Sequence, residues 1–172
     1  MKIVLEKLRK NLIIQKIKRL FYAILYRIKG ERIFTQTVVL SNGIKIKADY
    51  DKIDMLGSTD SFEIDVMKKL LRPGFVCLDV GANVGAYALN MSTEVKENGK
   101  VYAFEPSPET FKVLKENVKS SGLKNIVLHK YAVGDKLGET ILHVAFQSGL
   151  TGIGDTGRGT IVSKISVPMI TL

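Results

Sequence analysis

The stretch CLDVGANVGAYAL, from Cys77 to Leu89, decides the fold. An apolar run ends at Asp79, the glycines Gly81 and Gly85 enclose the tripeptide Ala-Asn-Val, and a second apolar run follows. This order is typical of a strand, a tight turn and a helix, in which the backbone of the turn comes close to a ligand. The stretch therefore predicts a strand over 75–80 and a helix over roughly 84–96.

Two further units follow the glycine turn. The segment KVYAFEPSPETFKVLKENVKSSGL predicts a strand over 101–104 and a helix that has Ser107 as its N-cap, Pro108 at its first position and Gly122 at its end. NIVLHKYAV predicts a third strand. Strands that alternate with helices through short connections indicate a βαβαβ core, in which a parallel sheet is covered by helices.

The flanking segments read differently. Upstream, Asn42-Gly43 predicts a hairpin with strands near 35–40 and 44–48, and a helix is expected to begin at a cap between Ser58 and Ser61. Downstream, ETILHVAF and TIVSKISVPMITL predict strands that are joined by the glycine-rich loop QSGLTGIGDTGRG. The chain would thus be an α/β protein that is preceded by a β-hairpin.

Length and composition limit the protein class. The 172 residues suffice for one domain with an appendage, and 45% apolar with 25% charged residues excludes both a disordered chain and a bundle of membrane spans. Residues 1–32 hold ten Lys or Arg and two Glu, which accounts for +8 of the net charge of +9. We expect two parts: a basic amphipathic helical extension over 1–32 and a Rossmann-like domain over 33–172.

The basic extension leaves two alternatives open. Apolar residues recur at helical spacing between residues 12 and 29, with Lys and Arg on the other face. Such a helix either lies on an anionic membrane surface or packs against protein. It lacks the features of a signal peptide, so we expect a cytoplasmic protein, with peripheral contact to the inner face of the membrane in the first case.

Cysteine and histidine give no sign of a metal site. The single cysteine, Cys77, reads as a small buried hydrophobic residue. His129 and His143 lie in separate strands without other ligands at metal-binding spacing, so no metal is expected.

The predicted strand ends point to a cofactor. The first strand ends at Asp79, the second at Glu105 and the third near Ala132 and Val133, and in such sheets ligands bind at this edge. Dinucleotides and S-adenosylmethionine both fit a strand-turn-helix with a ribose-binding acid on the next strand. A dinucleotide requires glycine where this chain has Asn83, whereas the cationic S-adenosylmethionine has no diphosphate and suits two acids.

On these motifs the chain resembles the FkbM-type S-adenosylmethionine-dependent methyltransferases, in which VCLDVGANVGAYAL, a Phe-Glu-Pro strand end and NIVLHKYAVGD have counterparts. The resemblance implies a class I methyltransferase sheet with S-adenosylmethionine as cofactor. It implies that Asp79, Gly81, Ala82, Asn83 and Gly85 surround the methionine end, that Glu105 binds the ribose, and that Pro106, Ala132 and Val133 lie at the adenine.

The resemblance also implies a function. We expect methyl transfer to a hydroxyl of a sugar, glycan or small molecule, and no nucleic-acid partner, since basic residues avoid the loops around the crevice. The FkbM pattern continues beyond VPMITL, so we expect a truncated chain whose sheet is incomplete at the C-terminus and whose catalytic residues are not assigned. The alternatives are a non-catalytic, membrane-associated remnant and an NAD-dependent oxidoreductase.

Overall fold

The computed structural model describes residues 36–48, 62–145, 150–154, 157 and 161–172. The predicted helical extension, its contact with a membrane and the cap between Ser58 and Ser61 lie outside these ranges, and the division at residue 32 stays a prediction. None of the helices in the described ranges has both the length and the apolar character needed to cross a bilayer.

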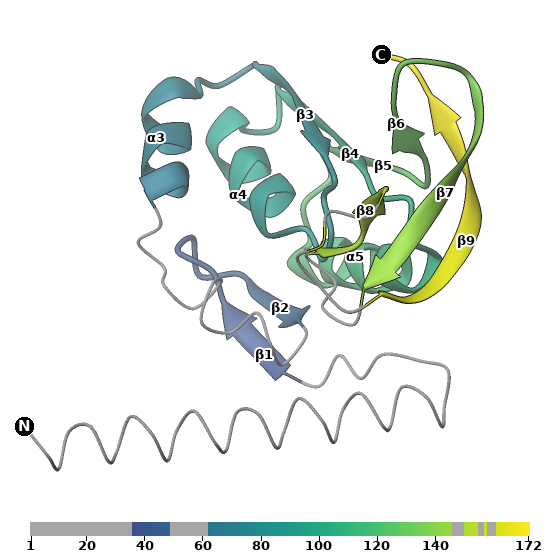
Figure 1. Ribbon diagram of the computed structural model, residues 1–172. Coiled ribbons are helices and arrows are strands. Elements are labelled where there is room, and N and C mark those ends of the chain that lie inside the picture. Colours follow the sequence, from purple (N-terminus) through teal and green to yellow (C-terminus); the bar gives the residue numbers. More distant parts are fainter. Residues whose placement is uncertain (1–35, 49–61, 146–149, 155–156, 158–160) are drawn as a thin grey trace, which may run out of the picture. The chain divides into compact units, whose positions relative to one another are not determined.

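A three-stranded parallel sheet forms the centre of the fold (Figure 1). Its strands, in spatial order, are β3 (Val76–Val80), β4 (Lys100–Phe104) and β5 (Ile126–His129). The connections run through α4 (Ala86–Val95) and α5 (Pro108–Ser121). The predicted βαβαβ core and the Rossmann-like fold class are confirmed.

Local sequence signals set the ends of α5. The Ser107 side chain accepts a hydrogen bond from the backbone N–H of Thr110, and Pro108 occupies the first turn. The helix ends at Gly122, whose φ of 75° is the left-handed conformation that favours glycine. These three features are those that the sequence predicts, because capping depends on residues close together in the chain.

The predicted hairpin and upstream helix are present as well. β1 (Gln36–Val39) and β2 (Lys45–Ala48) pair in antiparallel fashion, and α3 (Phe62–Leu70) packs against α4. Apolar side chains of the hairpin join those of the helices in one core. Its largest fully buried members are Ile46, Leu89, Leu114, Val84, Val95 and Val101.

A second sheet follows the central one, in the order β6-β9-β7-β8. Its strands are β6 (Ala132–Val133), β7 (Gly138–Ala145), β8 (Gly152–Ile153) and β9 (Ile161–Ile170). The third predicted strand is therefore two: β5 pairs with β4, and beyond Lys130 the chain enters the other sheet, where β6 pairs with β9. The described part of the glycine-rich loop contains the short strand β8, which pairs with β7.

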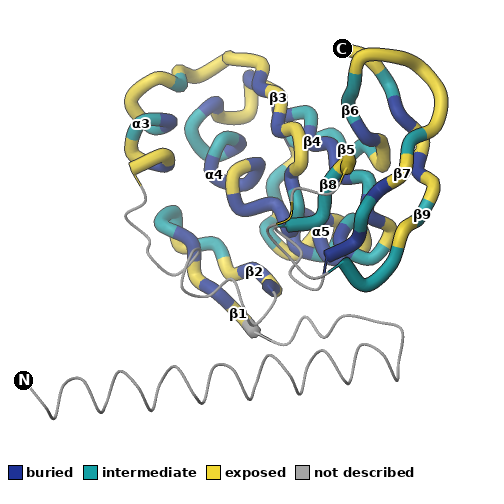
Figure 2. The backbone as a smooth tube through the Cα atoms, viewed as in Figure 1, coloured by how far each residue is buried: buried dark blue, intermediate teal, exposed yellow. Residues whose placement is uncertain are grey.

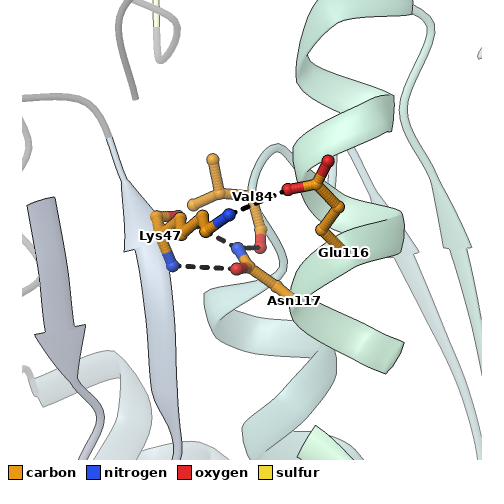
Figure 3. Close-up of polar contacts among 4 residues, drawn as sticks. All are labelled: Lys47, Val84, Glu116 and Asn117. Carbon is orange, nitrogen blue, oxygen red and sulfur yellow. Dashed lines mark hydrogen bonds and ion pairs between the residues drawn. The ribbon is translucent and has the colours of Figure 1, made fainter. Parts of the chain in front are cut away.

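One side chain links the hairpin to the glycine turn (Figure 3). The buried amide of Asn117 on α5 donates hydrogen bonds to the backbone carbonyls of Lys47 (3.0 Å) and Val84 (2.8 Å). Its Oδ1 accepts the backbone N–H of Lys47 at 2.8 Å. Asn117 thereby fixes β2, α5 and the glycine turn relative to one another.

Replacing Asn117 with alanine should destabilise the fold. Asn117→Ala removes the partner of the buried carbonyl of Val84 and of partly buried backbone groups of Lys47, so the free energy of unfolding should fall by about 2–4 kcal/mol in urea denaturation. The matched control is Glu116→Ala, which removes an exposed ion pair with Lys47 (3.1 Å) and should change stability by less than about 1 kcal/mol. Equal effects of the two variants would contradict this role of Asn117.

Candidate cofactor site

Backbone hydrogen bonds join the loop after β3 to the end of β4. The carbonyl of Phe104 accepts the N–H groups of both Gly81 and Ala82, each at 2.9 Å. One step further along the chain, the N–H of Glu105 donates to the carbonyl of His129 at 3.0 Å. The ends of all three parallel strands are therefore held in a fixed register at one edge of the sheet.

The side-chain carboxylate of Glu105 also joins the loop after β3 to the loop after β4. Its Oε2 accepts the backbone N–H of Asn83, and its Oε1 accepts that of Ser107, both at 2.9 Å. Hydrogen bonds from two backbone donors fix the position of the carboxylate. Because each carboxylate oxygen has a second lone pair, Glu105 can also accept hydroxyl groups of a ligand.

The two glycines of the turn have different roles. Gly81 has a φ of 80°, is exposed, and a Cβ at this position would meet no atom within 4 Å. Gly85 has a φ of 94° and is buried, and a Cβ here would lie 2.6 Å from Cδ1 of Leu114. Gly81 leaves space for a ligand, whereas Gly85 is required by helix packing.

A cavity of about 200 Å³ lies at this edge of the sheet. Six of its lining residues are predicted site residues, namely Gly81, Asn83, Glu105, Pro106, Ala132 and Val133. The other three predicted site residues, Asp79, Ala82 and Gly85, are buried and do not line it. The sequence missed the other lining residues, which are Val80, Tyr131, Leu142, Thr151, Gly152 and Ile153.

Asp79 is a buried acid at the end of β3. Burial raises its pKa from 3.8 to about 6, and a hydrogen bond from the backbone of Ala88 lowers the pKa by a smaller amount. The pKa of the nearby Tyr87 is raised by burial and by the negative charges of Glu63 and Asp79. Glu63 lies in the first turn of α3, and its charge acts on Tyr87 from there.

Two buried side-chain oxygens show whether the site suits S-adenosylmethionine. Oδ2 of Asp79 and Oδ1 of Asn83 have no hydrogen-bond partner among the described residues. A buried acceptor without a partner is costly, and a ligand that carries an ammonium group and hydroxyls can supply the missing donors. The residues present therefore fit the cofactor. Within the described ranges, no group of three or more His, Cys, Asp or Glu is placed to hold a metal ion.

Residues 37–136 match the family model of the TRM5/TYW2 methyltransferase domain. The chain belongs to this family. The match includes all the strands of the central sheet and every predicted site residue. Membership confirms an S-adenosylmethionine-dependent methyltransferase domain and the expected cofactor.

The sequence is similar to those of two tRNA-modifying enzymes. One relative is tRNA(Phe) (4-demethylwyosine(37)-C(7)) aminocarboxypropyltransferase of Pyrococcus horikoshii, to which the chain is 38% identical over 84 residues. The aligned region covers 49% of this chain and 29% of the relative. The other is tRNA (guanine(37)-N(1))-methyltransferase Trm5b of Pyrococcus abyssi, to which the chain is 31% identical over 103 residues. Here the aligned region covers 60% of this chain and 30% of the relative. The chain thus spans less than a third of the length of either relative.

Solved structures share parts of the fold. P. horikoshii TYW2 in complex with MeSAdo matches with a TM-score of 0.48 and 25% identity over 69% of this chain and 49% of that chain. A SAM-dependent methyltransferase from Aquifex aeolicus matches with a TM-score of 0.40 and 36% identity over 49% of this chain and 47% of that chain.

The family membership corrects two expectations. The resemblance to FkbM-type enzymes holds only at the level of an S-adenosylmethionine-dependent methyltransferase, since the matching model is that of the TRM5/TYW2 domain. The expectation of no nucleic-acid partner is wrong, because both relatives are named as tRNA-modifying enzymes. The glycine turn and Phe-Glu-Pro strand end do not discriminate between acceptors, since both motifs concern the cofactor.

Replacing Asp79 with asparagine should stabilise the ligand-free protein in a pH-dependent way. The raised pKa means that folded Asp79 retains its proton between about pH 4 and 6, so wild-type stability falls as pH rises through this window. Asp79→Asn removes the ionisation and should raise the free energy of unfolding by about 2–3 kcal/mol at pH 7.5, with little gain at pH 4.

Urea denaturation of both proteins at pH 4 and pH 7.5 measures this difference. The same difference in stability at the two pH values would show that Asp79 does not titrate in this range.

Proposed function

We propose that this domain transfers a group from S-adenosylmethionine to a base of an RNA molecule. The supporting observation is the TRM5/TYW2 match over residues 37–136, together with the convergence of Gly81, Asn83 and Glu105 on one cavity. Named tRNA-modifying relatives support RNA as the acceptor. They give no support to a sugar or glycan hydroxyl.

In this proposal the polar residues among the predicted site residues have roles that follow from their positions. Glu105, held by two backbone donors, accepts the hydroxyls of the cofactor ribose. The unpaired oxygen of Asn83 lines the cavity and accepts a hydrogen bond from the amino-acid end of the cofactor. The positive charge of that end lowers the electrostatic cost of the carboxylate of Asp79, which is buried next to the cavity-lining Val80. Bound cofactor supplies the electrophilic carbon beside its sulfonium sulfur. These residues hold the cofactor in place, which lowers the entropic cost of reaching the transition state.

A second candidate function differs in the group that is transferred. The P. horikoshii relative is named an aminocarboxypropyltransferase, whereas the P. abyssi relative is named a methyltransferase. Both groups are bonded to the sulfonium sulfur, so one cofactor site can serve either reaction. The by-product distinguishes them, because methyl transfer releases S-adenosylhomocysteine and aminocarboxypropyl transfer releases 5′-methylthioadenosine.

Removing the charge of Glu105 should weaken cofactor binding. Glu105→Gln keeps the size of the side chain and one carbonyl oxygen, but it replaces the other oxygen with an amide group that cannot accept a hydrogen bond. We expect the dissociation constant for S-adenosylhomocysteine to rise more than about tenfold in calorimetry. Glu116→Gln on the surface of α5 is the matched control and should bind like wild type. An unchanged affinity of Glu105→Gln would remove this residue from the site.

The basic N-terminal segment should contribute to RNA binding. Residues 1–32 carry a net charge of +8, and each phosphate contact by Lys or Arg releases counterions. Replacing Lys16, Lys18 and Arg19 with glutamine should weaken binding of a tRNA transcript and reduce the slope of log affinity against log salt by about one per lost contact.

A matched control keeps the change in net charge constant. The exposed residues Lys112, Lys115 and Lys119 on α5, replaced in the same way, should leave a larger part of the salt dependence intact. If the N-terminal and α5 variants lose affinity equally, or if wild type does not bind tRNA, the proposed role of this segment is refuted.

A further inference from the structure

One wall of the cofactor cavity comes from a part of the chain outside the family match. The match ends at residue 136, whereas Leu142 on β7 and Thr151, Gly152 and Ile153 at β8 also line the cavity. These positions are not among the predicted site residues, and the TRM5/TYW2 match does not include them. We call residues Leu142 and 151–153 the hairpin wall.

Strand pairing holds the hairpin wall in position. Leu142 pairs with Ile153 across the antiparallel β7–β8 ladder, and the backbone N–H of Ala145 donates a hydrogen bond to Oγ1 of Thr151 at 3.1 Å. On its other side β7 pairs with β9 along its whole length. Leu142 is fully buried in the second core cluster, with Ala132, Val144, Val167 and Met169.

The cavity has a polar and an apolar side. Gly81, Asn83 and Glu105 supply backbone and polar side chains, whereas apolar surface comes from Pro106 and Val133 and, in the hairpin wall, from Leu142 and Ile153. Its volume of about 200 Å³ is below the roughly 300–1,000 Å³ of pockets that enclose whole drug-sized ligands. The cavity therefore suits one part of the cofactor, and a ribose with its attached base matches the division into polar and apolar sides.

Ile153 is the most exposed apolar member of the hairpin wall. Residues paired across two antiparallel strands point to the same face, so Ile153 points to the cavity side, as Leu142 does. Ile153 as a residue remains half exposed (50%). A flat aromatic ring in the cavity would remove this apolar surface from water and gain affinity.

From this geometry we propose that the hairpin wall forms the apolar side of the purine subsite and that Ile153 is a specificity-determining residue for the base of the cofactor. The inference rests on the proposed use of S-adenosylmethionine. It adds a segment beyond residue 136 to the site, with contacts to the base and none to the group transferred.

The neighbouring strand offers a matched control. Ile141 on β7 is the same residue type, is exposed to nearly the same fraction (48%) and does not line the cavity. It precedes Leu142, so its side chain points to the opposite face of the sheet. A general effect of losing exposed isoleucine would be the same at both positions, whereas loss of a base contact would appear only at Ile153.

The test is calorimetric titration of the full chain with S-adenosylhomocysteine. Ile153→Ser should raise the dissociation constant about five- to tenfold, which corresponds to the loss of roughly half the burial of an isoleucine, whereas Ile141→Ser should change it less than about twofold. Ile153→Val keeps most of the apolar contact and should bind nearly like wild type. Circular dichroism checks that each variant is folded, and Ile153→Ala replaces Ile153→Ser if the latter is not.

The outcomes separate the two proposals. If wild type binds S-adenosylhomocysteine and the serine variants at 153 and 141 bind equally well, the hairpin wall has no part in the site, while the proposed cofactor stands. If wild type itself does not bind, the proposed function fails and the inference about the hairpin wall fails with it.

Discussion

The ends of β3 and β4 are held together by hydrogen bonds at Phe104 and Glu105, and the rest of the site depends on this connection. One backbone carbonyl accepts two N–H groups of the glycine turn, and one carboxylate accepts an N–H from each of the two loops. Because all these hydrogen bonds are made within the chain, they hold both loops in position around the cavity. An ordered site avoids part of the entropic cost of binding.

The same arrangement explains why the turn has the sequence that it has. Asn83 adopts a φ of 52°, a left-handed conformation that asparagine tolerates better than most residues, and this directs its N–H to Glu105. Gly81 leaves open space on the cavity side, and Gly85 allows Leu114 to pack against the turn. Figure 2 shows how burial alternates along the strands and helices that carry the site. Among the described residues, Asp79 and Glu105 are the buried acids.

Features of the fold that depend on local sequence signals could be predicted. Features that depend on contacts between distant segments could not. The caps of α5, the Asn42-Gly43 hairpin and the three parallel strands follow from residues close together in sequence. The split between β5 and β6 and the placement of β8 over the cavity depend on pairing with β9 and β7, for which the sequence carries no local sign. For the same reason, six predicted site residues line the cavity but the hairpin wall was missed. The expectation of no nucleic-acid partner was wrong, since the recognised motifs concern the cofactor alone.

An NMR titration of the ¹⁵N-labelled chain with S-adenosylhomocysteine tests the central claim that these strand ends form the cofactor site. The backbone amides of Gly81, Asn83 and Ser107 should shift on binding, together with those of Ala132 and Val133. The amides between Lys96 and Lys100, before the start of β4, should remain unchanged. Saturable shifts confined to the 96–100 region, or no shifts at millimolar ligand, would contradict the account.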